Sequence, residues 1–424
     1  MKFKILSRSV DTNRDVLRLY DNHLNTLVSA AGIPLCLQYD PRFERIHVEM
    51  PVENNRNRQY SKSKHLRQLR IQMGMNCNFN CKYCAQRNIQ ADICIRPDFA
   101  SDVGLFVSRL KSQVETIEAI HFTGGEVFVY KKKLIVLVEQ LKKAYPQAKI
   151  GIISNGSLLD FKLVTWLLKN KINLIISHDG PSFKIYRDNQ DILENPEILS
   201  AIAMYIDCSS KYDVRLQFNI VVTPENSNLS DIPGYFYSKL HRHVGLQFES
   251  IVKTNTRTKD KVTKFDNDSA NMLINSMLNA GSDRSSSNPL GYIGFLADKV
   301  VKRFVEEQDL RLLLYPCDNA QPDTLAVDLN GHILACQGVP NSISGYGSIE
   351  DLAQAVPTSP IPWTQRGDCR ECPFLVSCLG GCSIQNDEDH EISCHTLRIW
   401  HMGLFYTAWF RMFREIIYEI QPVN

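Results

Sequence analysis

Six short apolar runs between residues 68 and 253 alternate with amphipathic stretches, and this alternation constrains the fold more than any other feature. The predicted strands are Leu69–Met73, Ala119–Phe122, Ile150–Ser154, Leu174–Ser177, Val214–Val222 and Gly245–Val252. The predicted helices between them are 131–144, 158–169, 195–207 and 234–242. Their lengths suit right-handed crossovers between parallel strands. We therefore predict an α/β fold, a partial (β/α)6 barrel of parallel strands, followed by a cysteine-rich C-terminal domain.

Polar or glycine-containing motifs follow four of the predicted strands. Cys77 lies past the first strand, Gly124 past the second, Asn155 past the third and Asp179 past the fourth. In parallel barrels the active groups gather at the carboxyl ends of the strands. The sequence therefore predicts an active site at this rim.

Three cysteines within eight residues, Cys77, Cys81 and Cys84, form a CX3CX2C pattern. Three thiolates leave one iron of a 4Fe–4S cluster without a protein ligand, and such an iron is a place for chemistry. A zinc knuckle, which requires a fourth ligand, is the alternative. With Tyr83 just before the last cysteine, the triplet resembles the cluster motif of radical S-adenosylmethionine (SAM) enzymes. That resemblance implies that SAM binds the open iron and is cleaved to a 5'-deoxyadenosyl radical.

Three further motifs extend the resemblance to the binding of SAM. The turn Gly124–Gly125–Glu126 resembles the family motif in which a carboxylate holds the methionine amino group. Ser154 and Asn155 resemble the segment that contacts the ribose. Ser177 belongs to a stretch, 177–181, similar to one whose serine lies near the cofactor carboxylate. Within that stretch His178 replaces an apolar residue, and we favour a packing role for it over a catalytic one.

The C-terminal part holds seven more cysteines at ordered intervals, for which a zinc ribbon is the main rival explanation. Their spacing resembles the SPASM extension that carries auxiliary iron–sulfur clusters. The resemblance implies a distal cluster held by Cys369, Cys372, Cys378 and Cys394. It also implies a nearer cluster held by Cys317, Cys336 and Cys382, and thus three 4Fe–4S clusters in all. No further cysteine lies between Cys317 and Cys336, so the nearer cluster has an open iron or a ligand such as Asp318, Asp323 or Asp328.

The composition indicates which classes of partner and which cellular compartment to expect. The net charge of +2 gives no electrostatic reason for binding nucleic acid or a membrane surface. The first residues contain no sustained apolar stretch, and the thirteen cysteines are clustered, which favours reduced thiols in the cytoplasm. Cys36, Cys94 and Cys208 are isolated and receive no role.

The expected domains are an N-terminal segment 1–67, the barrel 68–253, a linker with helices 254–310, the SPASM domain 311–400 and a C-terminal helix 401–424. Within the first segment we expect a helix at 14–30 and strand-like alternation at 34–52. Some peptide maturases begin with a leader-recognition domain, so a peptide-recognition role for this segment is a further hypothesis.

The resemblance implies a maturase that oxidises a ribosomally synthesised peptide, with flavodoxin or ferredoxin as the electron donor. A side-chain crosslink (C–C, ether or thioether), of the cyclophane- or ether-forming type, is our specific prediction. Sulfatase-maturing enzymes carry an aspartate base directly after the second tail cysteine, where this chain has Gln337. Formylglycine formation is therefore an alternative, and an electron-transfer protein without catalytic activity is another. The catalytic residues are not written in these motifs.

Overall fold

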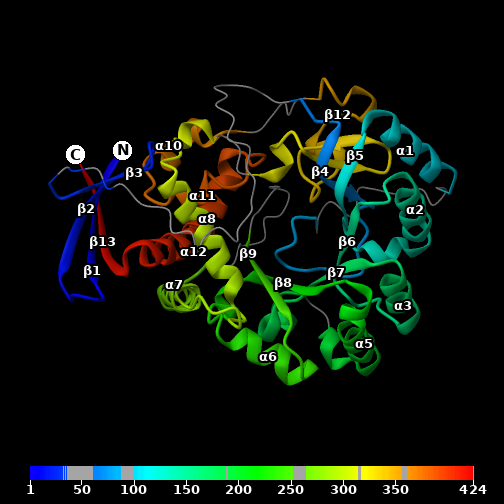
Figure 1. Ribbon diagram of the computed structural model, residues 1–424, viewed down its shortest axis with the longest axis horizontal. Helices are drawn as coiled ribbons and strands as arrows, with labels where there is room; N and C mark the ends of the chain where they lie inside the picture. Colours follow the sequence, from blue (N-terminus) through cyan, green and yellow to red (C-terminus); the bar gives the residue numbers. More distant parts are fainter. Residues whose placement is uncertain are drawn as a thin grey trace.

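The computed structural model describes residues 1–31, 33, 35, 61–86, 100–187, 190–251, 264–313, 317–355 and 361–423. A nine-stranded sheet with the order β12-β11-β10-β4-β5-β6-β7-β8-β9 forms its centre (Figure 1). The barrel strands are β4 (His65–Gln72), β5 (Thr116–Thr123), β6 (Lys149–Ser154), β7 (Ile172–Ser177), β8 (Leu216–Val222) and β9 (Gly245–Ser250). Each pairs in parallel with the next, which confirms the predicted fold class.

Helices cover the outer face of this curved sheet (Figure 1). They are α1 (Ala100–Gln113), α2 (Lys131–Ala144), α3 (Phe161–Lys169), the short α4 (Phe183–Tyr186), α5 (Pro196–Tyr212) and α6 (Asp231–Leu240). Local signals set their ends. The Asn195 side chain caps the start of α5 by accepting hydrogen bonds from the amides of Glu197 and Ile198. The helix ends at Asp213, whose backbone is left-handed.

The C-terminal part continues the barrel sheet, which the sequence did not predict. Strand β10 (Thr324–Asp328) pairs in parallel with β4, and β11 (His332–Leu334) and β12 (Gly345–Ser348) follow in antiparallel order. The short helices α9 (Asn341–Ser344), α10 (Gly367–Arg370) and α11 (Leu375–Cys378) complete this part. The cysteine-rich tail is thus joined to the first barrel strand by backbone hydrogen bonds.

A second sheet joins the two ends of the chain and corrects two predictions. Its order is β13-β1-β2-β3, with β1 (Lys2–Ser9), β2 (Asp15–Asp21), β3 (Thr26–Ser29) and β13 (Glu415–Val423). The helix expected at 14–30 is wrong, because Asp21 and the left-handed Asn25 form a turn between two strands. The helix expected at 401–424 ends at Phe413, after which left-handed Arg414 leads into β13. Of the stretch 34–52, nearly all lies outside the described residues.

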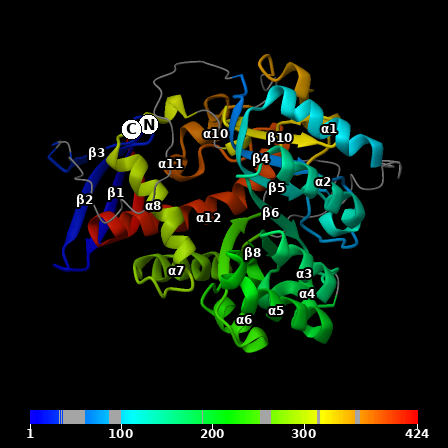
Figure 2. The same ribbon diagram turned by 45° about the vertical axis from the view of Figure 1, so that its right-hand side comes forward.

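Helices α7 (Asn267–Ser282), α8 (Gly291–Val305) and α12 (Asp387–Phe413) lie between the second sheet and the barrel. Figure 2 shows α12 running from this sheet toward the barrel. An aromatic cluster of Tyr20, Phe304 and Phe405 packs the second sheet onto α8 and α12. The sheet and the tail therefore share one apolar core.

Candidate active site

The Gly-Gly turn after β5 lies directly against the loop that carries the cysteine triplet. The amide of Gly125 donates to the carbonyl of Gly74 at 2.8 Å. A Cβ at Gly125 would stand 2.2 Å from the Asn76 oxygen, and one at Gly124, where φ is +138°, would stand 2.4 Å from the Gly74 oxygen. Only glycine allows this contact, so the two glycines fix the start of the cysteine loop.

The Glu126 carboxylate is fully buried and accepts three hydrogen bonds. Its Oε1 accepts from the Phe128 amide at 2.9 Å and the Ser154 hydroxyl at 2.8 Å, and its Oε2 accepts from the Asn155 amide at 2.7 Å. Burial raises the pKa of Glu126, and these three donors oppose the rise. The structure thus brings three predicted SAM-binding residues together, from the ends of two strands.

Asn155 connects this carboxylate to the cysteine loop. Its side-chain amide donates to the Asn78 oxygen at 2.9 Å and lies 3.9 Å from the sulfur of Cys77. The third strand end and the first predicted cluster ligand therefore adjoin each other, as the rim prediction requires.

The thiols of the triplet are turned toward one another and receive backbone donors. The amide of Phe79 lies 3.4 Å from the Cys77 sulfur, and the amide of Gln86 lies 3.4 Å from the Cys84 sulfur. Burial raises the pKa of Cys81 to about 12, and the neighbouring thiols Cys84 and Cys77 add to the rise. A positive charge beside these sulfurs is needed to hold them as thiolates.

Tyr83 is held by protein groups from the fourth strand end. Its hydroxyl donates to Asp179, which also pairs with Arg187 through hydrogen bonds of 2.8 and 3.0 Å. Asp179 and Arg187 are both buried, and the Arg187 charge opposes the burial that raises the pKa of Cys81. Sequence reasoning missed Arg187, because no motif joins it to the triplet.

Ser177, the last residue of β7, lies on the same rim, and His178 follows it. The ring of His178 is fully buried, with Nε2 2.9 Å from an oxygen of Asp191 and Nδ1 accepting from the Gly180 amide at 3.0 Å. Because Nδ1 accepts a hydrogen bond, Nε2 carries the ring proton and donates a hydrogen bond to Asp191. His178 is a packed residue, as the sequence favoured.

The tail cysteines interact in two groups, and these have the membership that the family resemblance implies. In the nearer group, burial raises the pKa of Cys336 to about 12, and the charges of Cys317 and Cys382 raise it further. In the distal group, burial raises the pKa of Cys378, and three neighbouring thiols add to it: Cys372, Cys369 and Cys394. The Cys369 sulfur also lies 3.4 Å from Nε2 of His390.

The donor sets fit iron–sulfur clusters. Within the described residues no three His, Cys, Asp or Glu side chains stand as ligands of a single metal ion would. The thiols are nonetheless grouped by three, three and four, and most of them have a pKa raised by burial. Bound iron supplies the positive charge that such thiolates require. The assignment of each thiol as a ligand stays a prediction.

The three aspartates predicted as alternative ligands all have protein partners. The pairs are Asp318 with Arg70 at 3.2 Å, Asp323 with Arg67 at 3.2 Å and Asp328 with His332 at 2.8 Å. Sequence reasoning missed a further contact in this region. The buried Lys62 ammonium donates to the carbonyls of Asn319, Gln321 and Thr324, and so fixes the loop that follows Cys317.

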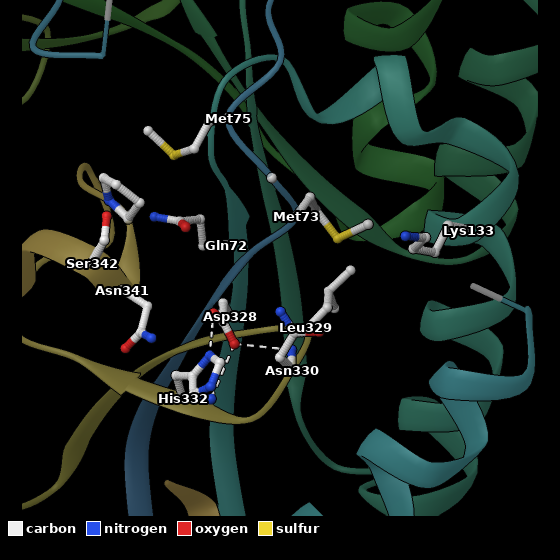
Figure 3. Close-up of a pocket in the computed structure, with 12 residues that line it drawn as sticks. Gln72, Met73, Met75, Lys133, Asp328, Leu329, Asn330, His332, Asn341 and Ser342 are labelled. Atoms are coloured by element: carbon white, nitrogen blue, oxygen red, sulfur yellow. Dashed lines mark hydrogen bonds and ion pairs between the residues drawn. The ribbon is translucent and has the colours of Figure 1, made fainter. Parts of the chain in front are cut away.

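A cavity of about 270 Å³ lies where the barrel rim meets the tail (Figure 3). Gln72, Met73 and Met75 border it from the β4 side, and Asp328 and His332 from the β10–β11 turn. The buried Gln72 amide donates to the carbonyls of two tail residues, Gln337 and Val339. The tail is therefore hydrogen-bonded to the rim of the barrel.

Residues 71–227 match the profile of the Radical SAM superfamily. This part of the chain is therefore similar to the domain that defines that superfamily. The chain is 23% identical over 265 residues to GTP 3',8-cyclase from Synechocystis sp., covering 59% of this chain and 77% of the relative. It spans half or less of several other curated relatives. Among the described residues, none of the helices has the length and apolar character needed to span a membrane.

Solved structures share the fold over most of this chain. One is native anSMEcpe with bound AdoMet and Cp18Cys peptide, with a TM-score of 0.57, 17% identity, and coverage of 82% of this chain and 98% of the other. Another is SuiB from Streptococcus suis, with a TM-score of 0.50, 17% identity, and coverage of 76% and 74%.

Proposed function

We propose that this chain is a radical SAM maturase that oxidises a ribosomally synthesised peptide and joins two of its side chains by a C–C, ether or thioether bond. The observation that carries the proposal is the nearer thiol group (Cys317, Cys336 and Cys382) beside a strand, β10, that extends the radical SAM sheet. When bound, SAM and its cluster supply a 5'-deoxyadenosyl radical. An auxiliary cluster at the nearer group would then receive the electron that a substrate radical must lose.

The residues of the rim have distinct roles in this proposal. Cys77, Cys81 and Cys84 hold the cluster that binds SAM, and Glu126 and Asn155 orient the methionine and ribose parts of SAM. The two tail groups hold the auxiliary clusters. The buried hydrogen bonds around Glu126 support this assignment, because they fix the carboxylate before any ligand arrives.

A crosslink is favoured over formylglycine formation by the residue after Cys336. The Gln337 side-chain oxygen accepts from the Asn319 amide at 2.7 Å and from Arg70 at 3.3 Å. A carboxamide in this position does not accept a proton as an aspartate would. Crosslink formation therefore requires a proton acceptor other than residue 337.

A peptide substrate is supported by the similarity in fold to anSMEcpe, which was solved with a bound peptide. We also propose flavodoxin or ferredoxin as the electron donor. Recognition of a leader peptide by residues 1–67 stays a hypothesis.

The test incubates the reconstituted protein with a reductant, SAM and a peptide encoded beside its gene. We expect 5'-deoxyadenosine and a peptide that has lost a pair of hydrogen atoms. Absence of 5'-deoxyadenosine would favour a protein that only transfers electrons. An aldehyde on the peptide would favour formylglycine formation, and a product from GTP would favour nucleotide cyclisation, as in the curated relative.

A further inference from the structure

A carboxylate on the last barrel strand faces the interior of the barrel. Glu249 lies near the carboxyl end of β9. Side chains along this strand point alternately to the two faces of the sheet. Leu246 and Phe248 are buried in the core between the sheet and its helices. Gln247 and Glu249 point the other way, and Gln247 donates to Gln217 of β8 at 3.0 Å. The Glu249 side chain remains accessible to solvent.

Two neighbouring groups stabilise the charged form of the Glu249 carboxylate, and one neighbouring charge destabilises it. The Asn219 side-chain amide donates to its Oε1 at 2.7 Å. Partial enclosure by the barrel raises the pKa of Glu249, the Asn219 hydrogen bond and the Arg187 charge lower it, and the Asp179 charge raises it. From α8, the Tyr292 hydroxyl is near enough that the Glu249 charge raises the pKa of Tyr292, which burial already raises.

The residues at the amino end of β9 line a cavity, whereas Glu249 lies near the opposite end of the strand. A cavity of about 610 Å³ lies beside β9 and is bordered by Gln217, Gly245, Tyr292 and Phe295. Tyr292 borders this cavity and also lies within electrostatic range of Glu249.

The other carboxylates of this rim are committed to protein partners. Glu126 accepts three hydrogen bonds, Asp179 is paired with the buried Arg187, and Asp191 accepts a hydrogen bond from Nε2 of His178. Their protonation would break buried pairs. Glu249 is accessible and forms no ion pair with another residue that the structure describes.

We propose that Glu249 accepts the proton that the peptide loses when its radical is oxidised. This inference rests on the proposed function. A peptide C–H bond breaks homolytically and its hydrogen atom joins the 5'-deoxyadenosyl radical to give 5'-deoxyadenosine. As the substrate radical formed its new bond, one electron would pass to the cluster that the nearer thiol group would hold, and one proton would leave from the partner atom to the Glu249 carboxylate. The peptide has then lost a pair of hydrogen atoms, and Glu249 returns its proton to water.

The test compares the reconstituted wild-type protein with Glu249→Gln, which keeps an oxygen for the Asn219 hydrogen bond but removes the basic carboxylate. We expect Glu249→Gln to lower crosslink formation by about 100-fold. 5'-Deoxyadenosine should still form, and peptide affinity should change by less than about 3-fold, which is under about 0.7 kcal/mol. Glu249→Asp should restore part of the rate. Glu139→Gln, an exposed change on α2, serves as the matched control.

Two pH-dependent measurements separate proton transfer from a structural role. Wild-type crosslink formation should fall as the pH falls through the raised pKa of Glu249, and this inflection should be missing in Glu249→Gln. Infrared titration of the reconstituted protein without peptide should show a carboxyl band with that pKa in the wild type and not in the variant. An unchanged crosslink rate, a retained inflection, or a loss of peptide affinity as large as the loss of rate would overturn the inference. If the wild type itself forms no 5'-deoxyadenosine, the proposed function fails instead.

Discussion

Among single residues, Glu126 is a fully buried carboxylate held by three hydrogen bonds. In Glu126→Gln an amide NH2 would replace a carboxylate oxygen that faces N–H and O–H donors. We expect the free energy of unfolding to fall by about 2–3 kcal/mol, because buried donors lose a charged acceptor. SAM affinity should fall as well. Urea unfolding and calorimetric titration with SAM measure the two effects, and the exposed Glu139→Gln should change neither by more than about 0.5 kcal/mol.

A second residue, His121, makes stability depend on pH. Burial, and then the positive charge of Arg70, lowers the pKa of His121 to about 4. The unfolded chain binds a proton near pH 6.5, so stability is lost as the pH falls from about 6.5 toward 4. At pH 5 the loss from His121 is about 2 kcal/mol. His121→Gln should flatten the curve of unfolding free energy between pH 7 and 5, whereas parallel curves for the two proteins would contradict this account.

Secondary-structure elements differ in how far local sequence determines them. The barrel strands were predictable because buried apolar residues recur at alternate positions along them, and α2 has the predicted bounds 131–144. Strand β13 was not predictable, because its partner β1 lies at the other end of the chain. The hairpin of β2 and β3 was missed because its turn depends on two residues, Asp21 and Asn25, inside a run with helical spacing.

The same distinction applies to the site. The thiol groups and the contacts of Glu126 follow from motifs with fixed spacing. The roles of Arg187 and Glu249 could not be predicted, because they depend on which strand residues face the barrel interior and on neighbours from other strands. A carboxylate without a surrounding motif gives no signal in one sequence.

At the level of elements, Glu415 joins α12 to the second sheet. Its carboxylate accepts from Ser7, from Arg18 at 2.6 Å and from the Trp409 ring nitrogen at 3.2 Å, and it is buried. Glu415→Ala would leave the Arg18 charge without its partner, so we expect a loss of about 3–5 kcal/mol in urea unfolding. Glu419→Ala, on an exposed position of the same strand, is the control. Equal effects of the two changes would show that Glu415 does not hold the elements together.

Across the whole molecule, the pairing of the chain ends changes how a leader-recognition role can be tested. Deleting residues 1–60 would also remove β1, the partner of β13, and would remove Tyr20, which covers part of the apolar core at Phe405. Lost peptide affinity would then report unfolding as readily as lost recognition. Substitution of exposed residues of the second sheet, such as Ile416 and Tyr418, is the sharper test.

The three thiol groups predict how much iron the protein binds and how that iron is distributed among the groups. Reconstituted wild-type protein should hold about twelve irons per chain, since each group is predicted to hold a four-iron cluster. Cys336→Ala and Cys378→Ala should each remove about four irons, and together about eight, because each thiol interacts with members of its own group. Cys208→Ala, on α5, should leave the content unchanged. Iron analysis with absorption spectroscopy measures this, and about four irons in the wild type would refute the tail clusters.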